Sequence, residues 1–205
     1  METSNPKQFW DNISNQPEWR DYVLPSRTDQ EFDDEGVKEA EQIHRQVTKK
    51  FEVAIDYGCG IGRITKPFRI YCKRMIGLDI CHKFIEIAKL RDKAEYYLTE
   101  NFKEKNVADF VFSISVLQHN DKPNQIKIMN EIYGLLKPGG IAYITFASGD
   151  VYFESSFIHK FGTLEILELA KNFSKIEIRD GNLVRYGGSV IKPNQFNERI
   201  LIATK

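Results

Sequence analysis

The sequence predicts one α/β domain built on a doubly wound, mostly parallel sheet of seven strands with helices on both faces. Three observations predict this class. Short apolar runs alternate with helix-like stretches from residue 51 onward, a glycine-rich turn follows the first apolar run, and an acidic residue ends the second. The length of 205 residues and the hydrophobic content of 41% suffice for one domain with a sizeable core.

The first 50 residues precede this alternation and are expected to form a separate arm and helix, with the domain proper covering residues 51–205. The arm is polar and charged, with Trp10, Trp19 and Tyr22 scattered through it, and Pro17 and Pro25 interrupt any period. It is therefore expected to be irregular. An amphipathic helix is expected over 35–50, where apolar residues recur at helical spacing. These residues are Val37, Ala40, Ile43 and Val47.

Seven apolar runs of strand length follow, separated by turn or helix signals. The expected strands are Phe51–Tyr57, Met75–Ile80, Tyr96–Leu98, Val107–Leu117, Ile141–Phe146, Lys175–Arg179 and Arg199–Ala203. The expected helices between them are a stretch ending near Lys73, then Lys83–Arg91, Pro123–Leu136 and Thr163–Asn172.

Two of these helices carry proline signals. Pro67 lies well inside the first helix, where it removes a backbone hydrogen bond, so this helix is expected to be kinked or to begin late. The helix over 123–136 is expected to end at Lys137-Pro138-Gly139-Gly140, which cannot continue it. Its apolar stripe is predicted to consist of Ile126, Met129, Ile132 and Leu136.

The net charge and the spacing of the cysteines bear on which binding partners the sequence indicates. Lysine plus arginine equals aspartate plus glutamate at 29 each, so the net charge indicates neither a nucleic acid nor an anionic membrane. The three cysteines lack zinc-ligand spacing, and no metal site is expected. The N-terminus has no signal-peptide pattern, and no apolar run approaches the roughly 18 residues of a membrane span. A soluble, cytoplasmic protein is expected.

The turn after the first strand is the most informative segment. Gly58, Gly60 and Gly62 stand at alternate positions directly after an apolar strand that ends near Asp56. Glycines let the backbone turn tightly and approach a ligand closely, and the carboxyl ends of strands are where open α/β sheets bind ligands. Dinucleotide-binding proteins would require a further glycine at position 63, which is Arg63 here.

An acidic residue at the end of the second strand completes the pattern. Asp79 follows Gly62 by 17 residues, where its carboxylate can accept hydrogen bonds from both hydroxyls of a ribose. A glycine turn combined with this acid indicates an adenosine-containing ligand.

Four segments together resemble the class I S-adenosylmethionine-dependent methyltransferases. D-Y-G-C-G-I-G-R at 56–63 and M-I-G-L-D-I at 75–80 look like the first two motifs of the family. Residues 108–119 resemble its fourth strand and residues 135–141 the approach to its fifth. The resemblance covers about 50–148 in register, and the tail fits the last helix and the terminal antiparallel β-hairpin in order. The resemblance implies the class I methyltransferase fold with S-adenosyl-L-methionine as cofactor.

The resemblance also implies roles for individual residues around the cofactor. Asp56 would reach the ammonium group, Asp79 would hold the ribose, and Ile80 would pack on the adenine. Because the usual polar pair after the third strand is missing, either Glu100 or Asn101 is expected to contact the adenine amino group. The remaining expected contacts are the glycine turn with Cys59 at the methionine part, the backbone carbonyl of Ser115 at the ammonium, and Arg27 at the carboxylate.

Acceptor-side residues are less strongly indicated. His119 follows the fourth strand and is either a general base or a residue that begins the next helix. Arg63 forms a structural ion pair or binds an acidic acceptor. The aromatic arm residues either close over the site as a lid or anchor the arm. Candidates for acceptor contact are Trp10, Trp19, Tyr22 and Tyr152.

The predicted activity is methyl transfer to oxygen or nitrogen of a small molecule or of a sugar in a glycan precursor. Only 15 residues, 147–161, separate the fifth strand from the last helix, which leaves little room for elements that bind a macromolecule. Methylation of RNA or protein is the alternative enzymatic function, although the sequence contains no basic run and no N/D-P-P-Y/F signature. A non-catalytic cofactor-binding module is the alternative from another class.

Overall fold

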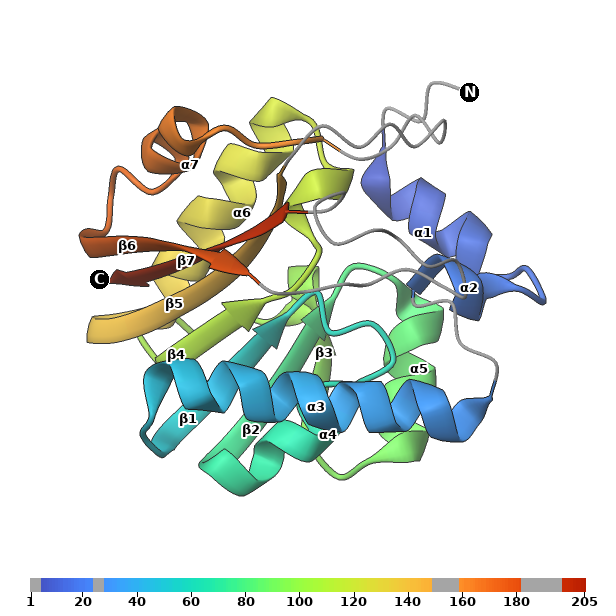
Figure 1. Ribbon diagram of the computed structural model, residues 1–205. Helices are drawn as coiled ribbons and strands as arrows, with labels where there is room; N and C mark the ends of the chain where they lie inside the picture. Colours follow the sequence, from blue (N-terminus) through green and yellow to red (C-terminus); the bar gives the residue numbers. More distant parts are fainter. Residues whose placement is uncertain (1–4, 24–27, 149–158, 182–196) are drawn as a thin grey trace. The chain divides into compact units, whose positions relative to one another are not determined.

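The computed structural model describes residues 5–23, 28–148, 159–181 and 197–205. Seven strands form a mixed sheet in the order β3-β2-β1-β4-β5-β7-β6 (Figure 1). The pairs β1–β2, β2–β3 and β4–β5 are parallel, whereas β7 is antiparallel to both β5 and β6. The predicted α/β class with a C-terminal antiparallel hairpin is therefore confirmed.

Every expected strand is present, with boundaries that differ by a few residues. The strands are β1 (Phe51–Tyr57), β2 (Cys72–Asp79), β3 (Glu95–Leu98), β4 (Ala108–Ser113), β5 (Leu136–Ser148), β6 (Ser174–Gly181) and β7 (Asn197–Thr204). The α-helices are α1 (Pro6–Ser14), α2 (Trp19–Val23), α3 (Asp29–Val47), α4 (Thr65–Phe68), α5 (His82–Arg91), α6 (Lys122–Leu135) and α7 (Thr163–Leu169). Described residues up to Lys103 form one compact unit, and those from Glu104 onward form a second.

The arm contains two helices, so the expectation of an irregular segment was wrong. Asn5 caps α1 by accepting hydrogen bonds from the backbone N–H groups of Lys7 and Gln8 at 3.0 and 3.4 Å. Pro6 occupies the first turn, where its missing N–H costs nothing. The two tryptophans then pack on Phe84 of α5, with ring centroids 6.2 Å (Trp10) and 5.5 Å (Trp19) away. Tertiary packing thus stabilises helices that are too short to be stable alone.

Helix α3 begins earlier than predicted, and its buried face includes the predicted Ala40 and Ile43 but not Val37. Thr28 and Glu31 form a capping box, which starts the helix at Asp29. The buried residues are Phe32, Gly36, Glu39, Ala40 and Ile43, whereas Val37 is 44% exposed. The apolar period alone misplaced the stripe because a glycine and a glutamate belong to the buried face.

The helix after the glycine turn begins late, which is one of the two outcomes expected from Pro67: α4 starts at Thr65, so Pro67 lies in its first turn, where a missing N–H costs no hydrogen bond. α4 contains four residues and continues as a 3-10 turn over Arg69–Tyr71, so β2 begins at Cys72 instead of Met75. In this unit β1 and β2 pair from Phe51↔Cys72 to Tyr57↔Leu78. The register brings the ends of the two strands, and the turns that follow them, to one edge.

In the second unit, α6 ends before Lys137-Pro138-Gly139-Gly140 as predicted, but this segment already belongs to β5. Gly139 adopts a φ of 78°, and Gly140 accepts a hydrogen bond from the N–H of Lys205 at 3.0 Å. The buried stripe of α6 consists of Gln125, Ile128, Met129, Ile132 and Leu135. Ile126 is 44% exposed, so its assignment to the stripe was wrong.

β4 ends at Ser113, four residues before its predicted end at Leu117. Ser115 adopts a φ of 58°, in the left-handed region, which no extended strand can contain. The last helix, α7, likewise ends at Leu169 instead of Asn172. Among the described residues, no helix combines the length and apolar character that crossing a bilayer requires.

Candidate functional site

The glycine turn has the backbone conformation that its sequence predicts. Gly58, Gly60 and Gly62 adopt φ values of 81°, 54° and 79°, a region that residues with a side chain rarely adopt. The N–H groups of Gly58 and Cys59 both donate to the carbonyl oxygen of Leu78, at 2.7 and 2.9 Å. The turn after β1 is therefore fastened to the end of β2.

Asp79 ties the same two segments together through its side chain. Its carboxylate accepts hydrogen bonds from the backbone N–H groups of Gly60 and Cys81, each at 2.8 Å. The side chain is buried, and burial raises its pKa, while these backbone donors oppose the shift. Sequence reasoning placed Asp79 at the site but missed its bond to the turn, which joins residues 19 apart.

Two of the glycines face different surroundings. Among the described residues, no atom lies within 4 Å of a Cβ added at Gly60, whereas one added at Gly62 would lie 2.4 Å from the hydroxyl oxygen of Tyr96. The described residues thus leave open space at Gly60, and Gly62 leaves room for a buried ring beneath the turn. An open cradle at Gly60 beside the Asp79 carboxylate fits an adenosine cofactor, because each carboxylate oxygen has a second lone pair for a ribose hydroxyl.

Asp56 lies at the end of β1 with its carboxyl group turned to the interior. It is 2% exposed and accepts a hydrogen bond from the Thr65 hydroxyl at 2.6 Å. Burial raises the pKa of Asp56 to about 7, although the Thr65 hydrogen bond opposes this. The carboxyl group can therefore exchange a proton near neutral pH. Its role toward an ammonium group stays a prediction.

The segment after β3 offers a polar atom that sequence reasoning missed. Glu100 is exposed, and its carboxylate pairs with Lys7 of α1 at 3.0 Å, while Asn101 is exposed as well. The hydroxyl group of Thr99 is buried and has no hydrogen-bond partner among the described residues. Ile80, the expected adenine contact, is half-buried at the end of β2.

Of the two alternatives for Arg63, the structure shows the ion pair, because its guanidinium group binds the carboxylate of Glu39. The arm tryptophans pack inward on Phe84, which is the anchoring alternative, and Tyr22 is 50% exposed. Arg27 and Tyr152 lie outside the described residues.

The second unit contains the candidates that follow β4. Ser115 donates its backbone N–H to the Thr145 hydroxyl on β5 at 3.0 Å, which holds its left-handed conformation in place. His119 ends a 3-10 turn over Leu117–His119 and is half-buried. His159 has an acidic partner, Glu165, with the ring Nε2 2.9 Å from a carboxylate oxygen. Glycine turn, Asp79 and Asp56 are thus together in the first unit, and Ser115 and His119 follow one strand in the second.

Known proteins resemble this chain in sequence and in fold. Residues 55–144 match the family model described as "Methyltransferase domain". A malonyl-[acyl-carrier protein] O-methyltransferase of Buchnera aphidicola is 32% identical over 108 residues, which are 50% of this chain and 43% of that protein. This chain therefore spans less than half the length of that relative.

Two solved structures share the fold. Magnesium protoporphyrin IX methyltransferase from Synechocystis, with bound S-adenosylhomocysteine, aligns over 98% of this chain and 100% of its own, with a TM-score of 0.70 and 15% identity. Phosphoethanolamine N-methyltransferase 2 of Haemonchus contortus, also with S-adenosylhomocysteine, aligns over 96% of this chain and 60% of its own, with a TM-score of 0.69 and 19% identity.

Proposed function

We propose that the chain is a class I S-adenosylmethionine-dependent methyltransferase and that it methylates an oxygen or nitrogen atom of a small acceptor. The observation that carries the proposal is the glycine turn with Asp79 beside it. Gly60 has a φ of 54° and borders space that the described residues leave open, and the Asp79 carboxylate lies within hydrogen-bond distance of its N–H. This combination suits a ligand with a ribose and supports S-adenosylmethionine as the cofactor.

The contribution of the chain is mainly binding and alignment. S-adenosylmethionine supplies an electrophilic methyl group on a sulfonium centre. Asp79 would hold the ribose, and the glycine turn would accept the methionine part without side chains in the way. Asp56 would bind the ammonium group in its ionised form. Because the methyl group is already electrophilic, holding it in line with the acceptor atom can account for much of the rate of methyl transfer.

The need for a base depends on the acceptor. A hydroxyl group must lose a proton during attack, and His119 is the residue we assign to that task. A carboxylate or a neutral amine attacks without losing a proton beforehand. Similarity to malonyl-[acyl-carrier protein] O-methyltransferases supports an oxygen acceptor, so a carboxylic acid is the first acceptor class to test.

Calorimetry and a transfer assay test the proposal together. The chain should bind S-adenosylmethionine at micromolar concentrations and NAD more weakly, because Arg63 occupies the position where dinucleotide-binding turns carry glycine. Tighter binding of NAD would overturn the cofactor assignment. Transfer of a labelled methyl group to a malonyl thioester, an alcohol or an amine should release S-adenosylhomocysteine. Binding with no transfer to any acceptor, including RNA and protein, would favour the non-catalytic module.

A further inference from the structure

A buried ion pair joins helix α3 to the exit of the glycine turn. The two terminal nitrogens of Arg63 donate to the two carboxylate oxygens of Glu39 at 2.9 and 2.7 Å. The side chains are only 8% and 4% exposed. A bidentate pair of this kind fixes orientation as well as distance, because two parallel hydrogen bonds define a plane. Residue 63 directly follows Gly62, so the pair fixes the backbone at the end of the turn.

The backbone of α3 touches the same residue. A Cβ added at Gly36 would lie 2.3 Å from the carbonyl oxygen of Arg63 and 2.9 Å from its Cγ. Only glycine therefore allows α3 to approach the turn this closely. Phe32, one turn earlier on α3, lies with its ring centroid 5.5 Å from the Arg63 guanidinium carbon. Three residues of one helix thus surround Arg63.

These contacts leave Arg63 no role as a surface group for an acidic acceptor. Both terminal nitrogens are occupied by Glu39, and the side chain is shielded from solvent. Buried ion pairs contribute little net stability, since desolvation offsets most of their attraction. Geometric control of the turn is a better explanation for a pair at this position.

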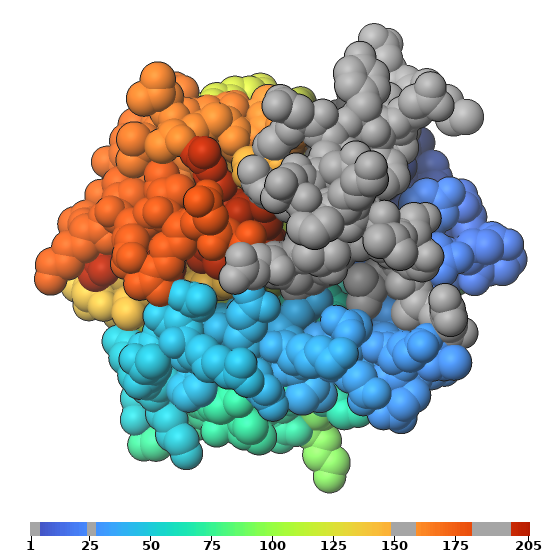
Figure 2. Space-filling view, in the orientation of Figure 1, coloured from blue at the N-terminus to red at the C-terminus, as the bar shows by residue number. Residues whose placement is uncertain are grey.

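We propose that Arg63, held by Glu39, is a positioning residue for cofactor binding, and that α3 thereby sets the shape of the glycine turn. The inference rests on the proposed function. It assigns part of the cofactor site to a helix over Asp29–Val47, which precedes the residues 55–144 matched by the family model. In the space-filling view, residues of α3 form a blue band on the surface of the first unit (Figure 2).

The experiment measures S-adenosylhomocysteine binding by calorimetry and thermal unfolding in the same variants. A double variant, Glu39→Leu with Arg63→Met, replaces the pair with apolar side chains and avoids an uncompensated buried charge. The double variant should unfold cooperatively at a temperature close to the parent midpoint. It should bind S-adenosylhomocysteine about tenfold more weakly, because the pair that positions the turn is gone. A folded double variant with the affinity of the parent would overturn the inference.

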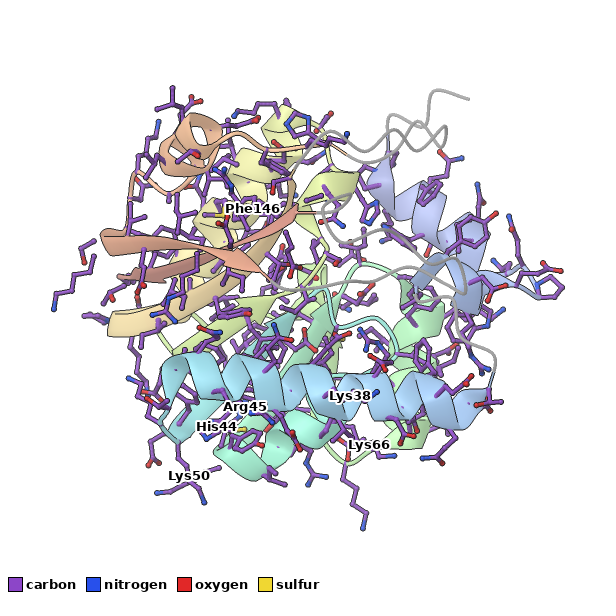
Figure 3. The ribbon with its side chains drawn as sticks, viewed as in Figure 1. Lys38, His44, Arg45, Lys50, Lys66 and Phe146 are labelled. Carbon is purple, nitrogen blue, oxygen red and sulfur yellow. The ribbon has the colours of Figure 1, made fainter. Side chains whose placement is uncertain are left out.

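Two further variants complete the design. Arg63→Lys keeps the charge but loses the bidentate contact with Glu39, so it should also weaken S-adenosylhomocysteine binding. If the double variant does not fold, the affinity of Arg63→Lys tests the inference in its place. Arg45→Met is the control, because Arg45 forms an exposed pair with Glu41 on the outer side of the same helix (Figure 3). It should bind like the parent, and weaker binding by this control would also count against the inference. A parent chain that binds no S-adenosylhomocysteine would instead refute the proposed function.

Discussion

Asp79 combines two tasks in one side chain. Its oxygens accept hydrogen bonds from Gly60 in the turn and from Cys81 after β2, so the carboxylate organises the backbone around the space where a ribose would bind. The N-cap residue of α5 is Cys81, which means that Asp79 is not itself the cap of that helix. Loss of Asp79 should therefore affect the cofactor directly and through the turn.

Asp79→Ala should weaken S-adenosylmethionine binding by about 1.5 to 3 kcal/mol, because charge-assisted hydrogen bonds are lost from a largely buried site. Asp79→Asn should lose less, since its amide oxygen still accepts one hydrogen bond. Calorimetry on both variants measures the difference. An Asp79→Ala variant that unfolds cooperatively and retains the parent affinity would show that the ribose assignment is incorrect.

Asp56 links stability to pH. Burial raises its pKa from 3.8 to about 7, so between these values the folded chain retains a proton that the unfolded chain has lost. The free energy of unfolding then falls as pH rises through this window. The contribution of this group is complete below the lower value and lost above the higher one.

Asp56→Asn removes this titration and keeps an oxygen that can accept the Thr65 hydrogen bond. Between pH 5 and pH 8, the melting temperature of the variant should therefore fall less than that of the parent. Thermal unfolding at several pH values measures both slopes. The same substitution at Asp180, whose side chain is 88% exposed, serves as the control and should leave the slope unchanged. Parallel curves for parent and Asp56→Asn would show that Asp56 does not titrate in this range.

At the scale of elements, the glycine turn is built in two layers. The described residues leave open space at Gly60, while the ring of Tyr96 fills the volume that Gly62 and Gly77 leave beneath the turn. A Cβ at Gly77 would lie 2.6 Å from that ring, and Tyr96 is only 3% exposed, so the ring has no room to move aside. The two positions should respond differently to the same substitution.

Gly60→Ala should cost about 1 kcal/mol of stability for its left-handed backbone and should weaken cofactor binding, because the new methyl group enters the open cradle. Gly62→Ala should cost more stability, about 2 kcal/mol or above, because the left-handed backbone strain is joined by a steric clash with the buried ring of Tyr96. Denaturant unfolding and calorimetry on the two variants separate the effects. Equal stability losses would contradict the two-layer description.

At the scale of the whole molecule, ligand binding and folding are coupled. S-adenosylhomocysteine at about one hundred times its dissociation constant should raise the free energy of unfolding by about 2.7 kcal/mol, because only the folded chain binds it. NAD at the same concentration should have a much smaller effect. Thermal shift measurements with both ligands test this, and equal shifts would argue against a site selective for S-adenosylmethionine.

The sequence by itself determined the features that depend on local pattern. The alternation of apolar runs and helices predicted all seven strands, and the spacing of glycines with Asp79 predicted the turn and its partner strand. These signals are local because a positive φ requires glycine and a buried strand requires consecutive apolar residues, whatever surrounds them. The end of β4 and the length of α4 were harder to predict from the sequence. Each depends on one residue, the left-handed Ser115 after β4 and the proline within α4, and not on a repeated pattern.

Only the tertiary structure decided which distant residues support the site. The pairing of Arg63 with Glu39, the approach of Gly36 and the position of Tyr96 under Gly62 all join residues far apart in the chain. The arm helices depend in the same way on Phe84. Hydrophobic period could not predict these contacts, because a buried glutamate and a buried glycine belong to the packed face of α3 only when their partners are in place. The physical reason is that packing and charge pairing are properties of the assembled core and not of any one segment.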